Sequence, residues 1–251
     1  MKMKLENFKD ILVANTSSSE IINRIIEDLN GDNKIIVNFI NAHCFNMYYK
    51  DSKYAEAINK STYNLNDGIG MELGGKILGI HFKENLNGTD FMPRFLNSLE
   101  KSPNKRVFLL GGKESSVLNA KKELKSQFPE LNIVGIHNGY FRDSGQIIKQ
   151  INKAHVDCLI VGMGVPLQEK WVFENKEFLN VKAIFSVGAY LDFTAMTIKR
   201  APRIIRRLRL EWLFRLCLEP KRMWKRYIIG NLQFFFNVLI KSKDFWGNSI
   251  K

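Results

Sequence analysis

Short apolar runs rich in Val, Ile and Phe recur along most of this chain, and each ends in glycine or another turn-favouring residue. Stretches with the apolar spacing of amphipathic helices lie between them. Strands that alternate with helices at this spacing are typical of a mainly parallel sheet with helices on both faces. We therefore expect an α/β, Rossmann-like fold. The predicted strands are 34–41, 105–112, 132–140, 157–166 and 181–189.

Helix-like spacing is clearest at 115–128, where Val117, Ala120 and Leu124 share one face and charged residues fill the other. The stretches 145–154 and 170–178 are similar. In parallel sheets, ligands bind beyond the carboxyl ends of the strands. We therefore expect a site at this edge of the sheet. Glycines lie at several of the predicted strand ends: Gly111, Gly112, Gly162, Gly164 and Gly188.

Positive charge is concentrated near the C-terminus. The chain has a formal net charge of +13, and residues 199–226 hold eleven Lys and Arg against two Glu, a net charge of +9. Such asymmetry indicates a polyanionic or membrane-surface partner for this segment. Because the charge balance changes near Met196, we expect an α/β catalytic domain over 1–195 and a basic helical appendage over 196–251.

The basic segment has apolar residues at helical spacing. Pro202 suits a helix start, Pro220 predicts a break, and a second helix is expected from about Lys221. Basic amphipathic helices with Trp and Tyr are typical of elements that lie on a membrane surface. Two alternatives stay open, a domain-capping helix pair with a solvated basic face and a nucleic-acid-binding tail. The longest apolar run, 228–240, is too short to span a bilayer.

The cysteines, the N-terminus, the histidines and the acidic residues limit which compartment and which chemistry are expected. The three cysteines are far apart, and the N-terminus lacks the apolar core of a signal peptide, so we expect a reducing, cytoplasmic compartment. The four histidines lack metal-ligand spacing, and no cofactor is expected. No Asp-x-Asp occurs, so an enzyme for nucleotide diphosphates would need arginines or helix ends to stabilise the leaving charge.

Three polar motifs each have a structural and a functional interpretation. Asp67, in LNDGIG, is either a turn residue or a carboxylate that accepts a proton from a hydroxyl. Thr89 or Asp90, in NGTD, either caps a helix that starts near Phe91 or binds substrate. Asp192, in GAYLDFTA, either caps a helix or binds a ligand hydroxyl.

Two further motifs follow predicted strands. Gly111 and Gly112, in LLGGKESS, form a tight turn or bring backbone N–H groups to a phosphate at a helix start. Gln168 and Glu169 lie at a helix start in GVPLQEKW. Glu169 suits the helix dipole, whereas Gln168 is a candidate to bind a base or sugar edge.

Taken together, these motifs resemble the TagA/WecG/CpsF glycosyltransferases (glycosyltransferase family 26), and the resemblance covers about residues 10–240. The matching elements, in the family's order, are NAHC (41–44), NDGIG (66–70), NGTD (87–90), FLLGGK (108–113), HNGYF (137–141), GMGVPLQEKW (162–171), VGAYLDF (187–193) and RAP–LEWLFRL–EP–RY within 200–227.

The resemblance implies an inverting, metal-independent reaction in which a sugar moves from a UDP-sugar to a lipid-diphosphate-linked saccharide. By position, Asp67 matches the general base, Asn41 an active-site Asn and Gln168 a donor-pocket residue. Arginines of the appendage are implied to reach the phosphates while it docks on an anionic membrane, with the protein peripheral on the inner face of the cell membrane. A homo-oligomer is left open. The remaining substrate-binding candidates are Asn66, Gly68, Thr89, Asp90, Gly111, Gly112, Asp192, Arg207, Arg215, Arg222 and Arg226.

This chain also departs from the family pattern. Phe39 and Ile40 stand where a Thr is common, and Asn85 stands where a basic residue is common. Both changes bear on donor or acceptor preference. N-acetylmannosamine is the leading donor in cell-wall synthesis, and another hexose, glucose or galactose, in capsule or exopolysaccharide synthesis is the alternative. A nucleotide-dependent oxidoreductase, which lacks its GxGxxG here, and a nucleic-acid-binding protein rank behind both.

Overall fold

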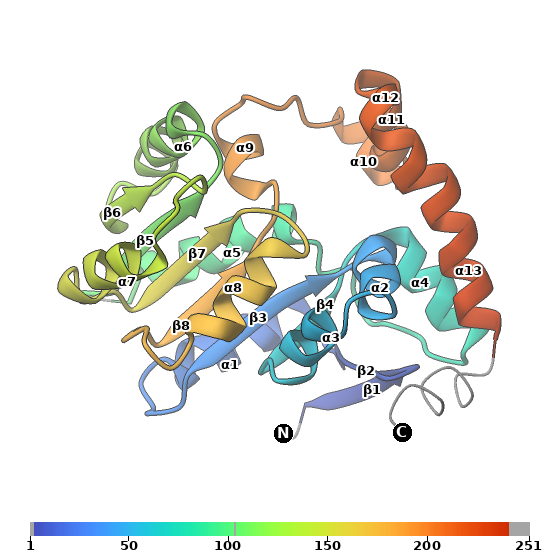
Figure 1. The fold of residues 1–251 in the computed structure, drawn as a ribbon, viewed down its shortest axis with the longest axis horizontal. Coiled ribbons are helices and arrows are strands. Elements are labelled where there is room, and N and C mark those ends of the chain that lie inside the picture. The colour runs from blue at the N-terminus through green and yellow to red at the C-terminus, as the bar shows by residue number, and fades with distance from the viewer. Residues whose placement is uncertain (1–2, 103, 241–251) are drawn as a thin grey trace.

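Helices cover both faces of a single sheet in the computed structural model, which describes residues 3–102 and 104–240 (Figure 1). Within these residues the sheet has eight strands in the order β1-β2-β4-β3-β8-β7-β5-β6. Only the edge strand β1 is antiparallel to its neighbour, and the other pairs are parallel. The strands are β1 (Lys4–Phe8), β2 (Ile11–Asn15), β3 (Ile35–Ile40), β4 (Tyr63–Asn66), β5 (Arg106–Gly111), β6 (Asn132–His137), β7 (Cys158–Gly162) and β8 (Ala183–Ser186).

The expected α/β fold is confirmed, and all five predicted strands are present as β3, β5, β6, β7 and β8. The prediction missed the hairpin of β1 and β2 and the short strand β4. The helices of the α/β body, within the described residues, are α1 (Ser18–Asp28), α2 (Ala42–Tyr48), α3 (Ser52–Asn59), α4 (Gly68–Ile77), α5 (Gly88–Glu100), α6 (Glu114–Gln127), α7 (Ser144–Lys153), α8 (Leu167–Asn175) and α9 (Tyr190–Thr194).

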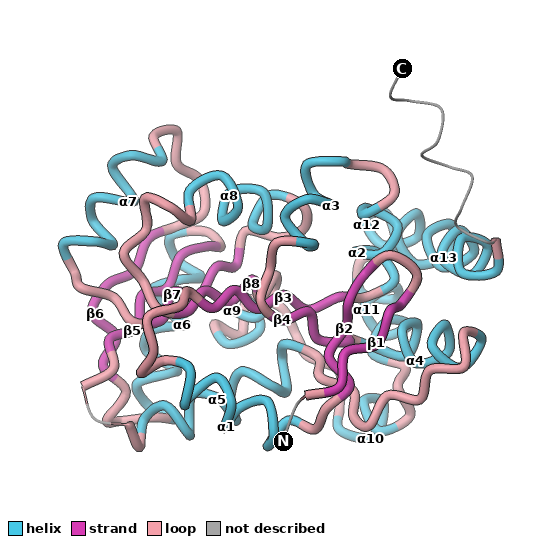
Figure 2. Tube along the Cα trace, turned by 90° about the horizontal axis from the view of Figure 1, so that it is seen from below, coloured by secondary structure: helices cyan, strands magenta, loops and turns pink. Residues whose placement is uncertain are grey.

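Two layers of helices sandwich the sheet (Figure 2). Alternate residues of β3 point to opposite faces, so Val37 and Phe39 join one apolar cluster while Ile36 and Ile40 join others. Helices α1, α5, α6 and α9 cover the first face, and α2, α3, α7 and α8 the second. Because β3 leads to α2 on one face and the adjacent β8 leads to α9 on the other, the chain reverses direction between these two strands, which is where a ligand site is expected in such a sheet.

The basic segment folds as a chain of short helices that returns to the body. They are α10 (Arg203–Arg207), α11 (Glu211–Leu218), α12 (Pro220–Trp224), a π-helical turn (Lys225–Ile229) and α13 (Gly230–Leu239). The start at Pro202 and the break at Pro220 are as predicted. An additional break occurs at Arg209, whose φ is 61°.

Helix α13 lies beside α2 and α4 (Figure 1). Its Phe234 is fully buried against Phe8 and Phe45. Gly74 of α4 makes room for this ring, because a Cβ on Gly74 would lie 2.7 Å from it. The C-terminal helices therefore share a core with the body. Within the described ranges, no helix is long and apolar enough to cross a membrane.

Candidate active site

Asp67 and Asn41 follow directly after neighbouring parallel strands, β4 and β3. The backbone N–H of Asp67 donates to the carbonyl of Ile40 at 2.8 Å, which fixes the two strand ends side by side. Asn41 Nδ2 donates to Asp67 Oδ2 at 3.3 Å. The carboxylate and the amide that the sequence singled out are thus in contact at the carboxyl edge of the sheet.

The orientation of the Asn41 amide follows from its second role as N-cap of α2. Its Oδ1 accepts from the backbone N–H groups of His43 and Cys44, at 3.0 and 3.1 Å. Because a cap must accept, the NH₂ group is left to face Asp67. The Asn41 amide therefore presents its donor, not its acceptor, to the carboxylate.

The charge around Asp67 comes largely from the C-terminal helices. Burial raises the pKa of the Asp67 carboxyl, the hydrogen bond from Asn41 lowers it, and the carboxylate of Glu211 raises it again. Arg226 and Arg215 lower the pKa by smaller amounts, and the net result is a pKa above the usual range. A half-buried carboxylate of this kind is a stronger base than an exposed one and suits proton removal from a hydroxyl.

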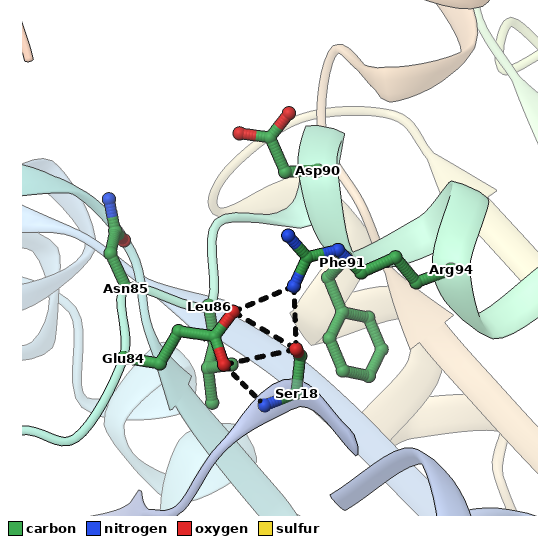
Figure 3. Close-up of a pocket in the computed structure, with 7 residues that line it drawn as sticks. All are labelled: Ser18, Glu84, Asn85, Leu86, Asp90, Phe91 and Arg94. Carbon is green, nitrogen blue, oxygen red and sulfur yellow. Dashed lines mark hydrogen bonds and ion pairs between the residues drawn. The ribbon is translucent and has the colours of Figure 1, made fainter. Parts of the chain in front are cut away.

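Asn66, the last residue of β4, holds a neighbouring loop in place beside this site. Asn66 is 1% exposed, and its Nδ2 donates to the backbone carbonyl of Glu84 at 2.9 Å. The backbone N–H of Leu86 donates to the backbone carbonyl of Asn66. The loop of residues 84–86 is also held by Glu84, which accepts from Ser18 and Arg94 in a small cavity of about 70 Å³ (Figure 3). Asn66 thus anchors a loop, and its contact with a ligand stays a prediction.

The NGTD motif differs from the expectation in its capping residue. Neither Thr89 nor Asp90 is the N-cap of α5, because Asn87 takes that place and accepts from the Asp90 N–H at 3.0 Å. Asp90 instead pairs with Arg200 at 2.6 Å and with Arg206 at 3.5 Å. Burial raises the pKa of the Asp90 carboxyl. Asn87 and the two arginines together lower it by more than burial raises it, so the net pKa falls below its usual range. Thr89 lies half-buried in the same first turn.

A second group of candidates lies further along the same edge of the sheet, at the end of β5. Gly111 and Gly112 both have positive φ, 144° and 65°, and a Cβ on Gly111 would lie 2.4 Å from the Gly162 carbonyl oxygen. Helix α6 begins after them with no side-chain cap, so its first N–H groups are available to an anion. Asp192 lies within the first turn of α9, not at its cap, and a Cβ on Gly112 would lie 3.3 Å from its Oδ1.

Gln168 lies at the start of α8, as predicted, but it is only 2% exposed. Its Oε1 accepts from the N–H groups of Gly164 and Gly188 at 3.1 and 3.0 Å, and its Nε2 donates to Glu169 at 2.7 Å. Gln168 thereby ties together the loops after β7 and β8. Glu169 is equally buried, and burial raises its pKa to about 7.

The four arginine candidates divide into two pairs. Arg215 lies over the ring of Phe193 at 5.2 Å, and Arg226 is half-buried and close enough to Asp67 to affect its charge. Arg207 is exposed, and Arg222 is exposed and pairs with Glu219 at 2.6 Å. Of these four arginines, Arg215 and Arg226 lie close enough to Asp67 to affect its pKa.

Sequence reasoning missed several residues of the site. Glu211 lies in the LEWLFRL motif and Arg200 in RAP, but the sequence pattern alone indicates no role for either. In the structure Arg200 pairs with Asp90 at 2.6 Å and with Glu211 at 3.6 Å. Asn85, which the sequence marks only as a departure from the family pattern, accepts through its Oδ1 from the Gly68 N–H at 2.8 Å. Burial, followed by Arg226 and Lys50, lowers the pKa of the nearby His43 to about 4.

Comparison with known proteins shows which proteins this chain resembles along most of its length. A profile of the family described as "Glycosyl transferase WecG/TagA/CpsF family" matches residues 6–246. The N-acetylglucosaminyldiphosphoundecaprenol N-acetyl-beta-D-mannosaminyltransferase of Bacillus subtilis (strain 168) is 29% identical over 228 residues, 90% of this chain and 88% of that protein. Proteins of the same name from Staphylococcus aureus (strain NCTC 8325 / PS 47) and Bacillus spizizenii are 28% and 26% identical, over 84% and 71% of this chain and 78% and 69% of their own.

Proposed function

Because the chain belongs to the WecG/TagA/CpsF family of glycosyl transferases, we propose that it transfers N-acetylmannosamine from a UDP-sugar to a polyprenyl-diphosphate-linked saccharide. The reaction inverts the anomeric configuration and uses no metal. The observation that carries the proposal is the contact of Asp67 with Asn41, beside the charged groups of α11 and the π-helical turn. The names of the relatives, each a transferase to N-acetylglucosaminyldiphosphoundecaprenol, support the acceptor class.

In the proposed mechanism, Asp67 takes the proton of the acceptor hydroxyl as that oxygen attacks the anomeric carbon. The new C–O bond forms while the bond to the UDP oxygen breaks in line, and UDP leaves with the electron pair. The raised pKa of Asp67 supports its role as the base. The uncapped start of α6 after Gly112 and the guanidinium of Arg215 meet the charge that grows on UDP.

Residues 196–251 form the proposed appendage that docks on the anionic inner face of the cell membrane, of which 241–251 lie outside the described residues. Exposed apolar side chains on α13 support this role, with Leu232, Phe236 and Leu239 each 64–69% exposed. The +9 charge of 199–226 supports attraction to anionic lipid. Docking would bring the active site to the lipid-linked acceptor.

The decisive experiment is a screen of UDP-sugars with a synthetic polyprenyl-diphosphate-GlcNAc acceptor. UDP-N-acetylmannosamine is expected to give product, and UDP-glucose and UDP-galactose test the alternative donors. Asp67→Asn is expected to keep the fold and lose turnover by about 10²–10⁴-fold, the usual contribution of a general base. Failure of every donor would refute the proposed transfer, and near-normal turnover of Asp67→Asn would refute the role of Asp67.

A further inference from the structure

The Gln168 side chain makes its hydrogen bonds within the protein and is only 2% exposed. Its Oε1 accepts from the backbone N–H groups of Gly164 and Gly188, at 3.1 and 3.0 Å, and its Nε2 donates to Glu169 Oε1 at 2.7 Å. Because two backbone donors need an acceptor, the amide oxygen faces the glycines and the NH₂ group faces Glu169. Both polar atoms of Gln168 thus have protein partners, and the side chain acts on the two loops that hold these glycines.

These two loops lie beside the proposed place of UDP. They follow β7 and β8, which are neighbouring parallel strands and end at the carboxyl edge of the sheet (Figure 1). The carbonyl of Gly162, where the loop after β7 begins, accepts from the N–H of Gly112 at 3.1 Å, just before the start of α6. The loop after β8 leads into α9, whose Asp192 Oδ1 would lie 3.3 Å from a Cβ on Gly112. A change in either loop is therefore expected to move groups that border the nucleotide.

Glu169 is a carboxylic acid that is buried without a basic partner among the described residues. It is 3% exposed, and its Oε2 has no hydrogen-bond partner within residues 3–102 and 104–240. Lys170, the next residue, pairs instead with Asp51 at 2.8 Å. The titratable neighbours of Glu169 include Cys44 of α2 and Tyr54 of α3, whose pKa values its charge raises. Burying such an acid is costly to folding, so this position is expected to contribute something other than stability.

We infer that Glu169 is a positioning residue: through Gln168, it holds the loops after β7 and β8 in the shape that receives the UDP-sugar. Glu169 Oε1 gives the NH₂ group of Gln168 a buried acceptor, so the amide stays in place with its oxygen on Gly164 and Gly188. Without that acceptor the NH₂ group would be buried and unpaired, and the side chain would turn to water and release both glycines. The inference rests on the proposed function, because it takes the nucleotide sugar as the ligand at these loops.

The first test compares two substitutions of Glu169. Glu169→Gln keeps an acceptor oxygen for Gln168, whereas Glu169→Met has a similar length and lacks one. Because small displacements of binding groups have large effects, Glu169→Met is expected to raise KM for UDP-N-acetylmannosamine about 10-fold or more, with KM for the lipid-linked acceptor unchanged. Glu169→Gln should match the native protein in both. Equal donor KM values for the two variants would overturn the inference.

A double-variant cycle shows whether Glu169 acts through Gln168. Gln168→Met alone should raise the donor KM as Glu169→Met does, and the combined variant should be little worse, because residues in one hydrogen-bonded unit are not additive. Effects that multiply would show that Glu169 acts by another route and would overturn the inference. Glu169→Met is expected to fold, since it removes a buried acid, and urea unfolding checks this. Glu169→Leu, with a different apolar shape, takes its place if it does not fold.

Asn152→Leu is the matched control. The Asn152 side chain also holds a loop by two hydrogen bonds, to the carbonyl of Phe178 at 2.8 Å and from the N–H of Asn180 at 2.7 Å. This loop precedes β8, at the opposite edge of the sheet. Its loosening should lower the free energy of unfolding and leave the donor KM unchanged. If Asn152→Leu raises the donor KM as much as Glu169→Met, the inference is wrong while the proposed function stands.

A second test needs no sugar transfer. Hydrogen exchange of the Gly164 and Gly188 amides should be about 10-fold faster or more in Glu169→Met and unchanged in Glu169→Gln, because these N–H groups lose their acceptor only in the former. Unchanged exchange in Glu169→Met would overturn the inference, and so would faster exchange with an unchanged donor KM. If exchange responds as expected but the native protein transfers no sugar from any donor, the proposed function fails while the hold of Glu169 on the loops stands.

Discussion

At the residue scale, the positions of the main site residues could be predicted from the sequence, whereas the hydrogen bonds of the buried polar side chains could not. The positions of Asp67 and Asn41 followed from strand ends and motif order, because parallel strands end at one edge. The hydrogen bond of Gln168 with Gly188 and that of Asn66 with Glu84 could not be predicted, because each partner lies in a loop distant in the sequence. No local pattern identifies such a partner.

Glu169 predicts a pH-dependent stability. Burial raises its pKa from 4.5 in the unfolded chain to about 7 in the folded one. A raised pKa gives stability that is complete below the unfolded pKa and is lost as the pH rises through the folded one. Glu169→Gln should therefore be more stable than the native protein by about 3 kcal/mol at pH 8, with no difference near pH 4.

Urea unfolding at several pH values measures this difference. Glu174→Gln, in the same helix but exposed, is the control and should show no such trend. A gain for Glu169→Gln that is the same at pH 4 and pH 8 would show that the acid is not the cause.

Glu211 and Arg215 should shift the base in opposite directions. Because the Glu211 charge raises the pKa of Asp67, Glu211→Gln should move the acid limb of the kcat/KM profile to lower pH. Arg215 lowers that pKa, so Arg215→Gln should move the limb to higher pH and also lower kcat. Arg203→Gln, an exposed change on α10, serves as the reference, and shifts of the same sign for both variants would contradict this account.

At the element scale, prediction succeeded where apolar runs were long and failed where they were short or polar. Strands β3, β5 and β7 are buried along nearly their whole length and read as continuous apolar runs. Strand β4 has four residues, two of them Asn, and is held by bonds such as that from Asn64 to the carbonyl of Leu12. The break at Arg209 has no Gly or Pro, and an ion pair with Glu72 accompanies it.

The packing of α13 on α4 predicts opposite results for two glycines. In Gly74→Ala the new methyl group would lie 2.7 Å from Phe234 and 2.8 Å from Phe8, and overpacking of this kind costs about 1–3 kcal/mol. In Gly230→Ala the nearest atoms lie at 3.6 and 3.8 Å, so the better helix former should stabilise by about 0.5–1 kcal/mol. Free energies of unfolding in urea give both values, and a neutral Gly74→Ala would show that the helices are free to separate.

At the scale of the whole molecule, the charge asymmetry of the sequence suggested a separate tail, yet its last helix completes a core. Phe234 and Val238 are 0% and 1% exposed and lie with Phe8, Phe45 and Met71. Deletion of 197–251 would uncover that cluster, so loss of membrane binding after deletion would not separate docking from unfolding. Substitutions on the outer side of α13 provide the better test.

Replacement of Leu232, Phe236 and Leu239 by Ser should leave the fold intact and lower binding to anionic phospholipid vesicles by at least 10-fold, because these exposed groups supply the apolar contact. Phe178→Ser, which removes a side chain 68% exposed on the loop after α8, is the control. Co-sedimentation at low and physiological salt measures the bound fraction. Undiminished binding of the triple variant would place the docking surface elsewhere.

The close packing of Phe234 on Gly74 has a mechanical consequence. The Phe234 ring of α13 lies directly against the backbone of α4, the helix that follows Asp67. Because protein interiors are close-packed, a displacement of the C-terminal helix is expected to displace the helix that begins directly after Asp67.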